Sequence, residues 1–112
     1  MAFNKIVSKQ RKMRVVAFTA NAAGTALTGP DSLIVTMVDT GTGIKTITLN
    51  QPFADANYQV ILTSGTTAVV QEASITSKSV FVINGFDNAV GTTATDGIVH
   101  VLVIGSDTVD KF

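Results

Sequence analysis

The sequence predicts an all-β fold: an antiparallel β-sandwich or jelly roll of about seven to eight strands with an extended N-terminal arm. Three observations lead to this prediction. Val, Ile and Thr, whose branched side chains favour strands over helices, make up 40 of the 112 residues. Apolar residues do not recur convincingly at helical spacing. Alternating runs are instead separated by turn-forming residues about every 8–12 positions, as in sandwiches and small barrels.

The alternating runs define the predicted strands in chain order. In the third run, Lys45, Ile47 and Leu49 share one face and threonines occupy the other. This is the pattern of a strand with one face turned to a core and one to water. We expect strands at about residues 12–19, 32–38, 43–50, 57–64, 68–76, 79–84 and 97–105.

Turn residues set the connections between these strands. Residues 39–43 contain two glycines that are free to adopt positive φ, and they predict a hairpin between the second and third strands. Pro52 ends the third strand because it cannot donate to a ladder. The Ala-rich residues 20–26 are interrupted by Asn, Gly and Thr, so we expect a loop there. Residues 85–95 predict a long exposed loop.

The last predicted strand, from Ile98 to Ile104, has apolar residues on both of its faces. A strand of a two-layer sandwich usually packs one face inward and leaves the other in water. This strand is therefore expected to be covered by the N-terminal segment or by another subunit, in a closed symmetric oligomer. The residues predicted to form the subunit interface are Phe3, Ile6, Ile98, His100, Leu102 and Ile104.

Charge divides the chain into two parts, although the formal net charge is zero. Residues 1–14 carry five bases and no acid, whereas residues 15–112 carry three bases and eight acids. We therefore expect a basic arm over residues 1–14 and a single β-sandwich domain over residues 15–112. The arm is either a solvated terminus or a segment that docks on an acidic protein surface, and a nucleic-acid partner is disfavoured because the body is acidic. The candidate docking residues are Lys5, Lys9, Arg11, Lys12 and Arg14.

No motif in the sequence predicts catalysis. The chain has no Cys, and its single His, His100, lies within the most apolar run, where a structural or interface role is expected. The acids stand singly, and neither a phosphate-binding loop nor a nucleophile elbow occurs. We therefore expect no enzyme activity, no cofactor, no metal site and no small-molecule substrate. The apolar runs are too short for a secretion signal or a membrane span.

Several segments have a familiar order: GIKTITLNQPF at 43–53, YQVILTS at 58–64, SVFVIN at 79–84 and DGIVHVLVIGSD at 96–107. This order resembles the small β-sandwich virion proteins of tailed bacteriophages, notably capsid decoration (cement) proteins. The resemblance implies a homotrimer on the outside of the head that binds the major capsid protein and clamps neighbouring capsomers. It also implies synthesis in the host cytoplasm and no catalytic residues. The alternative is a tail-fibre or receptor-binding module that recognises a host surface through its loops at 20–29 and 85–95.

Overall fold

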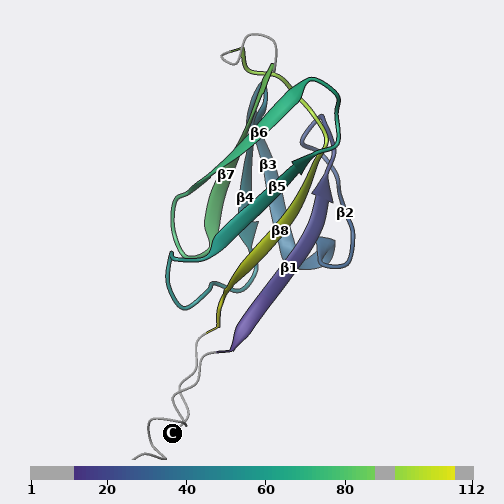
Figure 1. Cartoon of the computed structure of the whole chain (residues 1–112). Coiled ribbons are helices and arrows are strands. Elements are labelled where there is room, and N and C mark those ends of the chain that lie inside the picture. The colour runs from purple at the N-terminus through teal and green to yellow at the C-terminus, as the bar shows by residue number, and fades with distance from the viewer. Residues whose placement is uncertain (1–11, 88–92, 108–112) are drawn as a thin grey trace, which may run out of the picture.

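A computed structural model describes residues 12–87 and 93–107 of the chain (Figure 1). In these residues the chain forms two antiparallel four-stranded sheets that pack as a sandwich, so the all-β prediction is confirmed. No helix in the described part of the chain is long and apolar enough to cross a membrane. The elements are β1 (Met13–Ala20), β2 (Leu27–Thr28), the 3₁₀ helix η1 (Ser32–Ile34), β3 (Val35–Gly41), β4 (Ile44–Leu49), β5 (Gln59–Ser64), β6 (Val69–Ile75), β7 (Val80–Asp87) and β8 (Val99–Ser106).

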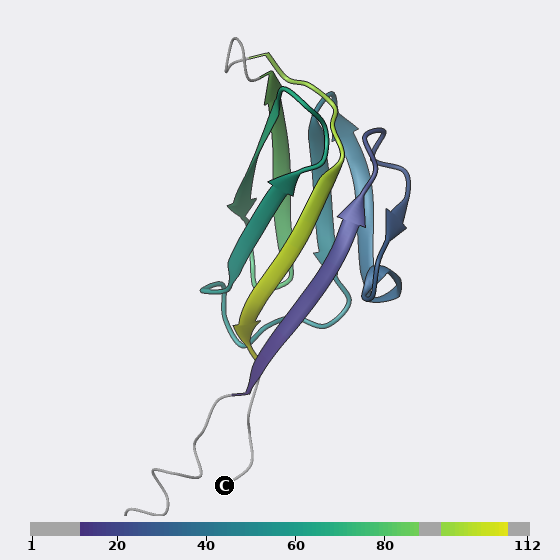
Figure 2. The same cartoon turned by 45° about the vertical axis from the view of Figure 1, so that its right-hand side comes forward.

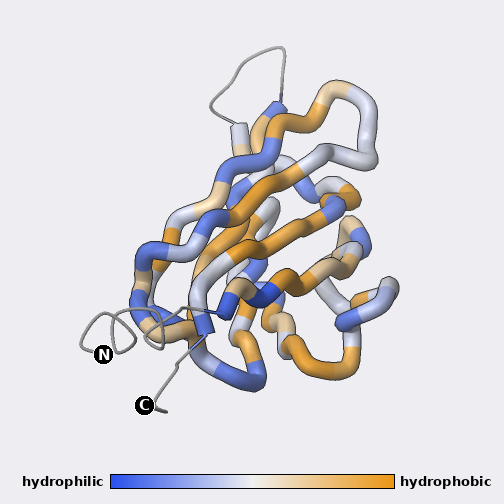
Figure 3. Tube along the Cα trace, turned by 60° about the horizontal axis from the view of Figure 1, so that its bottom comes forward, coloured by the Kyte–Doolittle hydropathy of each residue, from blue (hydrophilic) through white to orange (hydrophobic). Residues whose placement is uncertain are grey.

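The two sheets are named here by their central strands. The β1/β8 sheet has the order β2-β1-β8-β5, and the β4/β7 sheet has the order β3-β4-β7-β6. β1 begins and β8 ends at one end of the sandwich, called the lower end. The β3–β4 hairpin and the end of β7 lie at the opposite, upper end (Figure 1). Figure 3 shows hydrophobic stretches along the strands, with hydrophilic segments both within and between them.

The core forms between the two sheets, from the side chains on their inner faces. β1 contributes alternate residues from Val16 to Ala20, and β8 contributes alternate residues from Val99 to Val103. Phe53 and Tyr58, in the connection between β4 and β5, close the core and stack with ring centroids 4.9 Å apart. Gly105 leaves room for them, because a Cβ at that position would lie 2.6 Å from the Phe53 ring and 2.7 Å from Tyr58 Cβ. The other core side chains include Val35, Ile47, Leu49, Phe81 and Ile83.

Three elements differ from the sequence prediction. The segment predicted as a strand over 32–38 begins as η1, and only Val35 onward is extended. The short strand β2 was not predicted and pairs with the last two residues of β1. β7 continues to Asp87, three residues into the predicted loop at 85–95. Its glycine at 85 belongs to the ladder, where Thr95 O lies 2.5 Å from the position a Cβ would take.

Candidate protein-docking surface

The outer faces of the two sheets differ in chemistry. The β4/β7 sheet intersperses its outer valines with polar residues such as Thr36, Thr48 and Glu72. On the β1/β8 sheet, apolar residues occupy adjacent outer positions on three neighbouring strands, β1, β8 and β5. We call this second surface the apolar face, and its apolar members are Met13, Val15, Ala17, Ile61, Leu102 and Ile104.

Strand register makes the apolar face continuous. Ala17 of β1 and Ile61 of β5 both lie opposite Leu102 of the central strand β8. Val15 lies opposite Ile104 one step lower, and side chains paired in this way stand within contact distance on one face. With strands about 4.8 Å apart and about 3.3 Å per residue, the outer surface of three strands from Met13 to Thr19 is roughly 330 Å². The apolar face takes up about half of this surface, because the other outer positions are polar: Thr19, Gln59, Thr63, His100 and Ser106.

The exposed members of the apolar face remain in contact with water in the isolated chain. Met13 is 64% exposed, Val15 54% and Ile61 50%. Exposed apolar patches that are rimmed by polar residues often mark contact surfaces between proteins. The β1/β8 sheet therefore has one apolar layer in the core and a second that is open for contact.

The upper part of the apolar face contains a shallow hollow of about 300 Å³. Its lining includes Ala17, Pro30 and Leu102, so an inserted side chain would meet mainly apolar atoms. Thr19 and His100, which are cross-strand neighbours, lie at the same hollow and form a hydrogen bond of 2.9 Å between Oγ1 and Nδ1. The hollow can accept one projecting side chain from a partner surface.

The structure places four of the predicted interface residues on or beside this face. His100, Leu102 and Ile104 project outward from β8, and Ile98 lies just above them with 38% of its surface exposed. The backbone of Ile98 is held by Gly65 N–H, which donates to Ile98 O at 2.7 Å. Of the same predicted set, Phe3 and Ile6 lie outside the described residues.

Among the predicted arm residues, Arg14 has a role within the fold itself. Lys12 is exposed immediately before β1, and Lys5, Lys9 and Arg11 lie outside the described residues. Because β1 begins at Met13, Arg14 projects from a strand and turns toward the core.

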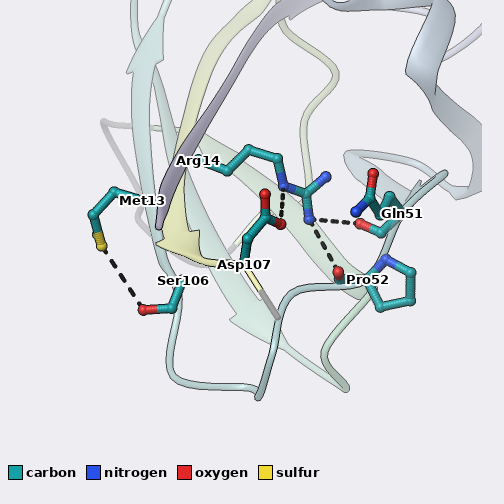
Figure 4. Close-up of polar contacts among 6 residues, drawn as sticks. All are labelled: Met13, Arg14, Gln51, Pro52, Ser106 and Asp107. Carbon is teal, nitrogen blue, oxygen red and sulfur yellow. Dashed lines mark hydrogen bonds and ion pairs between the residues drawn. The ribbon is translucent and has the colours of Figure 1, made fainter. Parts of the chain in front are cut away.

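Figure 4 shows how the Arg14 guanidinium closes the lower end. It forms an ion pair with Asp107 at 2.8 Å and donates to the carbonyl oxygens of Gln51 and Pro52 at 2.8 and 3.1 Å. It also lies 4.3 Å from the centroid of the Phe53 ring. These contacts tie the ends of β1 and β8 to the segment after β4, so this charge is already satisfied within the chain.

The upper end contains a buried lysine, which strand alternation had placed on the same face as Ile47 and Leu49. Lys45 is 2% exposed, as its position beside Ile47 on the inner face of β4 requires. Its ammonium donates to Gly97 O at 3.2 Å. Burial lowers the pKa of Lys45 below its ordinary value of 10.5, while the nearby charges of Asp96 and Asp39 oppose that shift.

The surroundings of Lys45 are polar but do not assemble a reactive site. Asp96 accepts a hydrogen bond from Gly43 N–H at 2.6 Å, which fixes the hairpin glycine at φ 71°. The side-chain amide of Gln71 is buried, with no hydrogen-bond partner within the described residues. No group of three or more His, Cys, Asp or Glu side chains is arranged to hold a metal in the described part of the chain.

Comparison of the chain with protein-family models, with curated proteins and with solved structures finds no match.

Proposed function

We propose that this chain is a structural virion protein that decorates the outside of a tailed-phage head and stabilises contacts between capsomers. The observation that carries the proposal is the apolar face, because a sheet that is apolar on both sides needs a covering layer on each. Residues 43–107 resemble decoration proteins, and this resemblance is the reason for proposing a phage head as the particle that the chain binds. The partners are then the major capsid protein and further copies of the chain, in a homotrimer. This role requires neither a cofactor nor catalysis.

The size of the apolar face supports a contribution from the basic N-terminal segment. A stable interface buries about 800 Å² on each partner, which is several times the area of the apolar face. In the proposal, residues 1–12 act as an arm that adds contact area and positive charge, with Phe3 and Ile6 covering apolar surface. Arg14 is not part of this arm, because its guanidinium is engaged at the lower end of the sandwich.

The first test is the mass of the full-length protein in solution by light scattering. The proposal expects three times the chain mass. It also expects Leu102→Lys to dissociate the oligomer, since a charge would then stand at the centre of the apolar face. Thr48→Lys, on the exposed outer face of the other sheet, is the matched control and should leave the mass unchanged. A parent protein that stays monomeric would contradict the trimer.

The second test is co-sedimentation with heads of the phage that encodes the chain. The parent protein should pellet with the heads, and a variant lacking residues 1–11 should bind more weakly. The deletion ends at residue 11 because β1 begins at Met13 and Arg14 stabilises the fold. Absence of the parent protein from the pellet would exclude the decoration role.

The second candidate function is a tail-fibre or receptor-binding module. The observation that favours it is the gathering of several turns at the upper end, including residues 21–26, 40–43 and 65–68 (Figure 1). Loops clustered at one end of a sandwich are a common way to build a recognition surface. Binding of the full-length protein to host-cell envelopes, lost on substitution in these turns and retained in Leu102→Lys, would favour this candidate over decoration.

A further inference from the structure

The lower half of β1 offers backbone hydrogen-bonding groups to an open side. Successive residues of a strand direct their N–H and C=O groups to opposite sides. Lys12 O accepts from Asp107 N–H at 2.7 Å, which places the even-numbered residues of β1 on the β8 side. Ala17 faces the other way, since it donates to the Asp31 carboxylate at 2.7 Å and accepts from Asp31 N–H at 3.0 Å. Met13 and Val15 have the same parity as Ala17 and share its direction.

Only the upper half of that side is covered. β2 pairs with Thr19 and Ala20, and Asp31 bonds to the backbone N–H and C=O of Ala17. Among the described residues, no hydrogen-bond partner on this side is found for the backbone of Met13 or Val15. Figure 2 shows no further strand beside the lower half of β1 on the side away from β8, while β2 and η1 lie higher. We call the stretch from Met13 to Val15 the open edge.

The side chains around the open edge are apolar and accessible. Met13 and Val15 are both more than half exposed. Next to Asp31, η1 adds Leu33 at 96% exposure and Ile34 at 39%. An exposed apolar edge strand is a template for pairing with an extended chain, where main-chain hydrogen bonds give affinity and alternate side chains give specificity.

Charge distinguishes between the two kinds of extended chain that could pair here. A second copy of β1, antiparallel and paired along the open edge, would bring together two chains that each carry the exposed Lys12 and three further bases before it in the sequence. Like charges directly opposite each other destabilise a strand pair. Arg14 does not add to this repulsion, because its guanidinium is paired with Asp107. An acidic strand meets the opposite situation, because the same cations attract it.

We propose that the open edge binds an extended segment of a partner protein, which adds a strand to the β1/β8 sheet. The segment has apolar residues at alternate positions, which pack beside Met13 and Val15, and acidic residues that face Lys12. This inference does not depend on the partner being a capsid protein. Strand addition also extends the apolar face sideways, because paired residues lie on the same side of a sheet.

The probe is a blocked seven-residue peptide of alternating glutamate and valine, titrated into full-length ¹⁵N-labelled protein. The expected result is saturable binding with the largest amide shifts at Met13, Val15 and their neighbours. A peptide with lysine in place of glutamate should bind at least about tenfold more weakly. Equal binding of the two peptides, or shifts confined to another edge such as β5, would overturn the proposal.

Two protein variants complete the test. Val15→Pro removes the N–H that points to the open edge and leaves the bonds to β8 intact, so the fold should be retained and binding lost. Val15→Thr keeps the N–H and the branched shape, and it should bind as the parent does.

Lys12→Glu provides a measurement that does not rely on proline. Because Lys12 is exposed, this variant should fold normally and should reverse the preference between the glutamate and lysine peptides. An unchanged preference would contradict the assigned charge match. Self-association that Val15→Pro abolishes and Leu102→Lys leaves intact, without acidic-peptide binding, would show that a second copy is the occupant of the open edge instead.

Discussion

Replacing Arg14 with alanine should destabilise the fold, although Arg14 lies in a basic stretch whose sequence suggests a surface arm. The guanidinium links β1 to the end of β8 through Asp107 and to the segment after β4 through two carbonyl groups. It also covers the Phe53 ring at the lower end of the core. Truncation removes all of these contacts at once and leaves Asp107 without its cation.

The magnitude follows from the separate contacts. Each hydrogen bond from a charged donor contributes about 1.5–3 kcal/mol, and the contact with the Phe53 ring adds about 0.5–1 kcal/mol. The side chains of the ion pair are 17% and 20% exposed, so part of each charge remains in water and we assign the pair about 0.5–1 kcal/mol. Such contributions overlap, and we expect Arg14→Ala to lower the free energy of unfolding by about 2–4 kcal/mol in total.

The assay is urea unfolding of the parent, Arg14→Ala, Asp107→Asn and the double variant. The midpoint should fall for Arg14→Ala without a change in the slope of the transition, and the double-mutant cycle should give a coupling of about 0.5–1 kcal/mol. Lys12→Ala is the matched control, because Lys12 is exposed and should change stability by less than about 0.5 kcal/mol. If Arg14→Ala were as mild as Lys12→Ala, the assignment of Arg14 to the lower end of the core would be wrong.

Three further predictions concern buried groups. Burial holds the pKa of Lys45 below 10.5, so just below that pH the folded state binds fewer protons than the unfolded state. The free energy of unfolding of the parent should therefore rise toward pH 10.5, and Lys45→Met should remove this rise in pH-dependent unfolding. Burial raises the pKa of Tyr58 from 10.0 to about 12, so the free energy of unfolding should fall by about 1.4 kcal/mol per pH unit between pH 10 and 12. Tyr58→Phe should abolish that fall, and it should cost about 1 kcal/mol at neutral pH because it removes the hydrogen bond that the Tyr58 hydroxyl donates to Ser77 O. Gly105→Ala should cost about 1–3 kcal/mol in urea unfolding, since the new methyl group meets Phe53 and Tyr58 at less than 3 Å; a neutral effect would contradict this packing.

The strands were predictable because their signal is local. Alternation along residues 44–49 assigns Lys45, Ile47 and Leu49 to one face, and all three are buried. The positive φ of Gly43 in the predicted hairpin was equally readable from residue type. The predictions failed where a distant residue competes with local preference. Asp31 bonds the backbone of Ala17, and the segment that follows it begins as η1 before the predicted strand is formed.

Only part of the candidate docking surface could likewise be predicted from the sequence. The doubly apolar pattern of the last strand indicated that Leu102 and Ile104 face outward together, and the structure places them there. Their neighbours Val15 and Ile61 belong to strands that are distant in sequence, so only pairing with β8 shows that they extend the same face. The open edge had no sequence signal, because nothing in β1 itself states how far β2 covers it.

By itself, the sequence determined that this protein is an all-β sandwich with a charge-divided chain and a last strand that is apolar on both faces. These properties depend on residue type and on a period of two, which any strand expresses without reference to its neighbours. The tertiary structure alone decided that Arg14 closes the core, that the Lys45 ammonium donates to Gly97 O and that Met13 and Val15 form an open edge. Each of these depends on strand order and register, which bring together groups that are far apart in the chain.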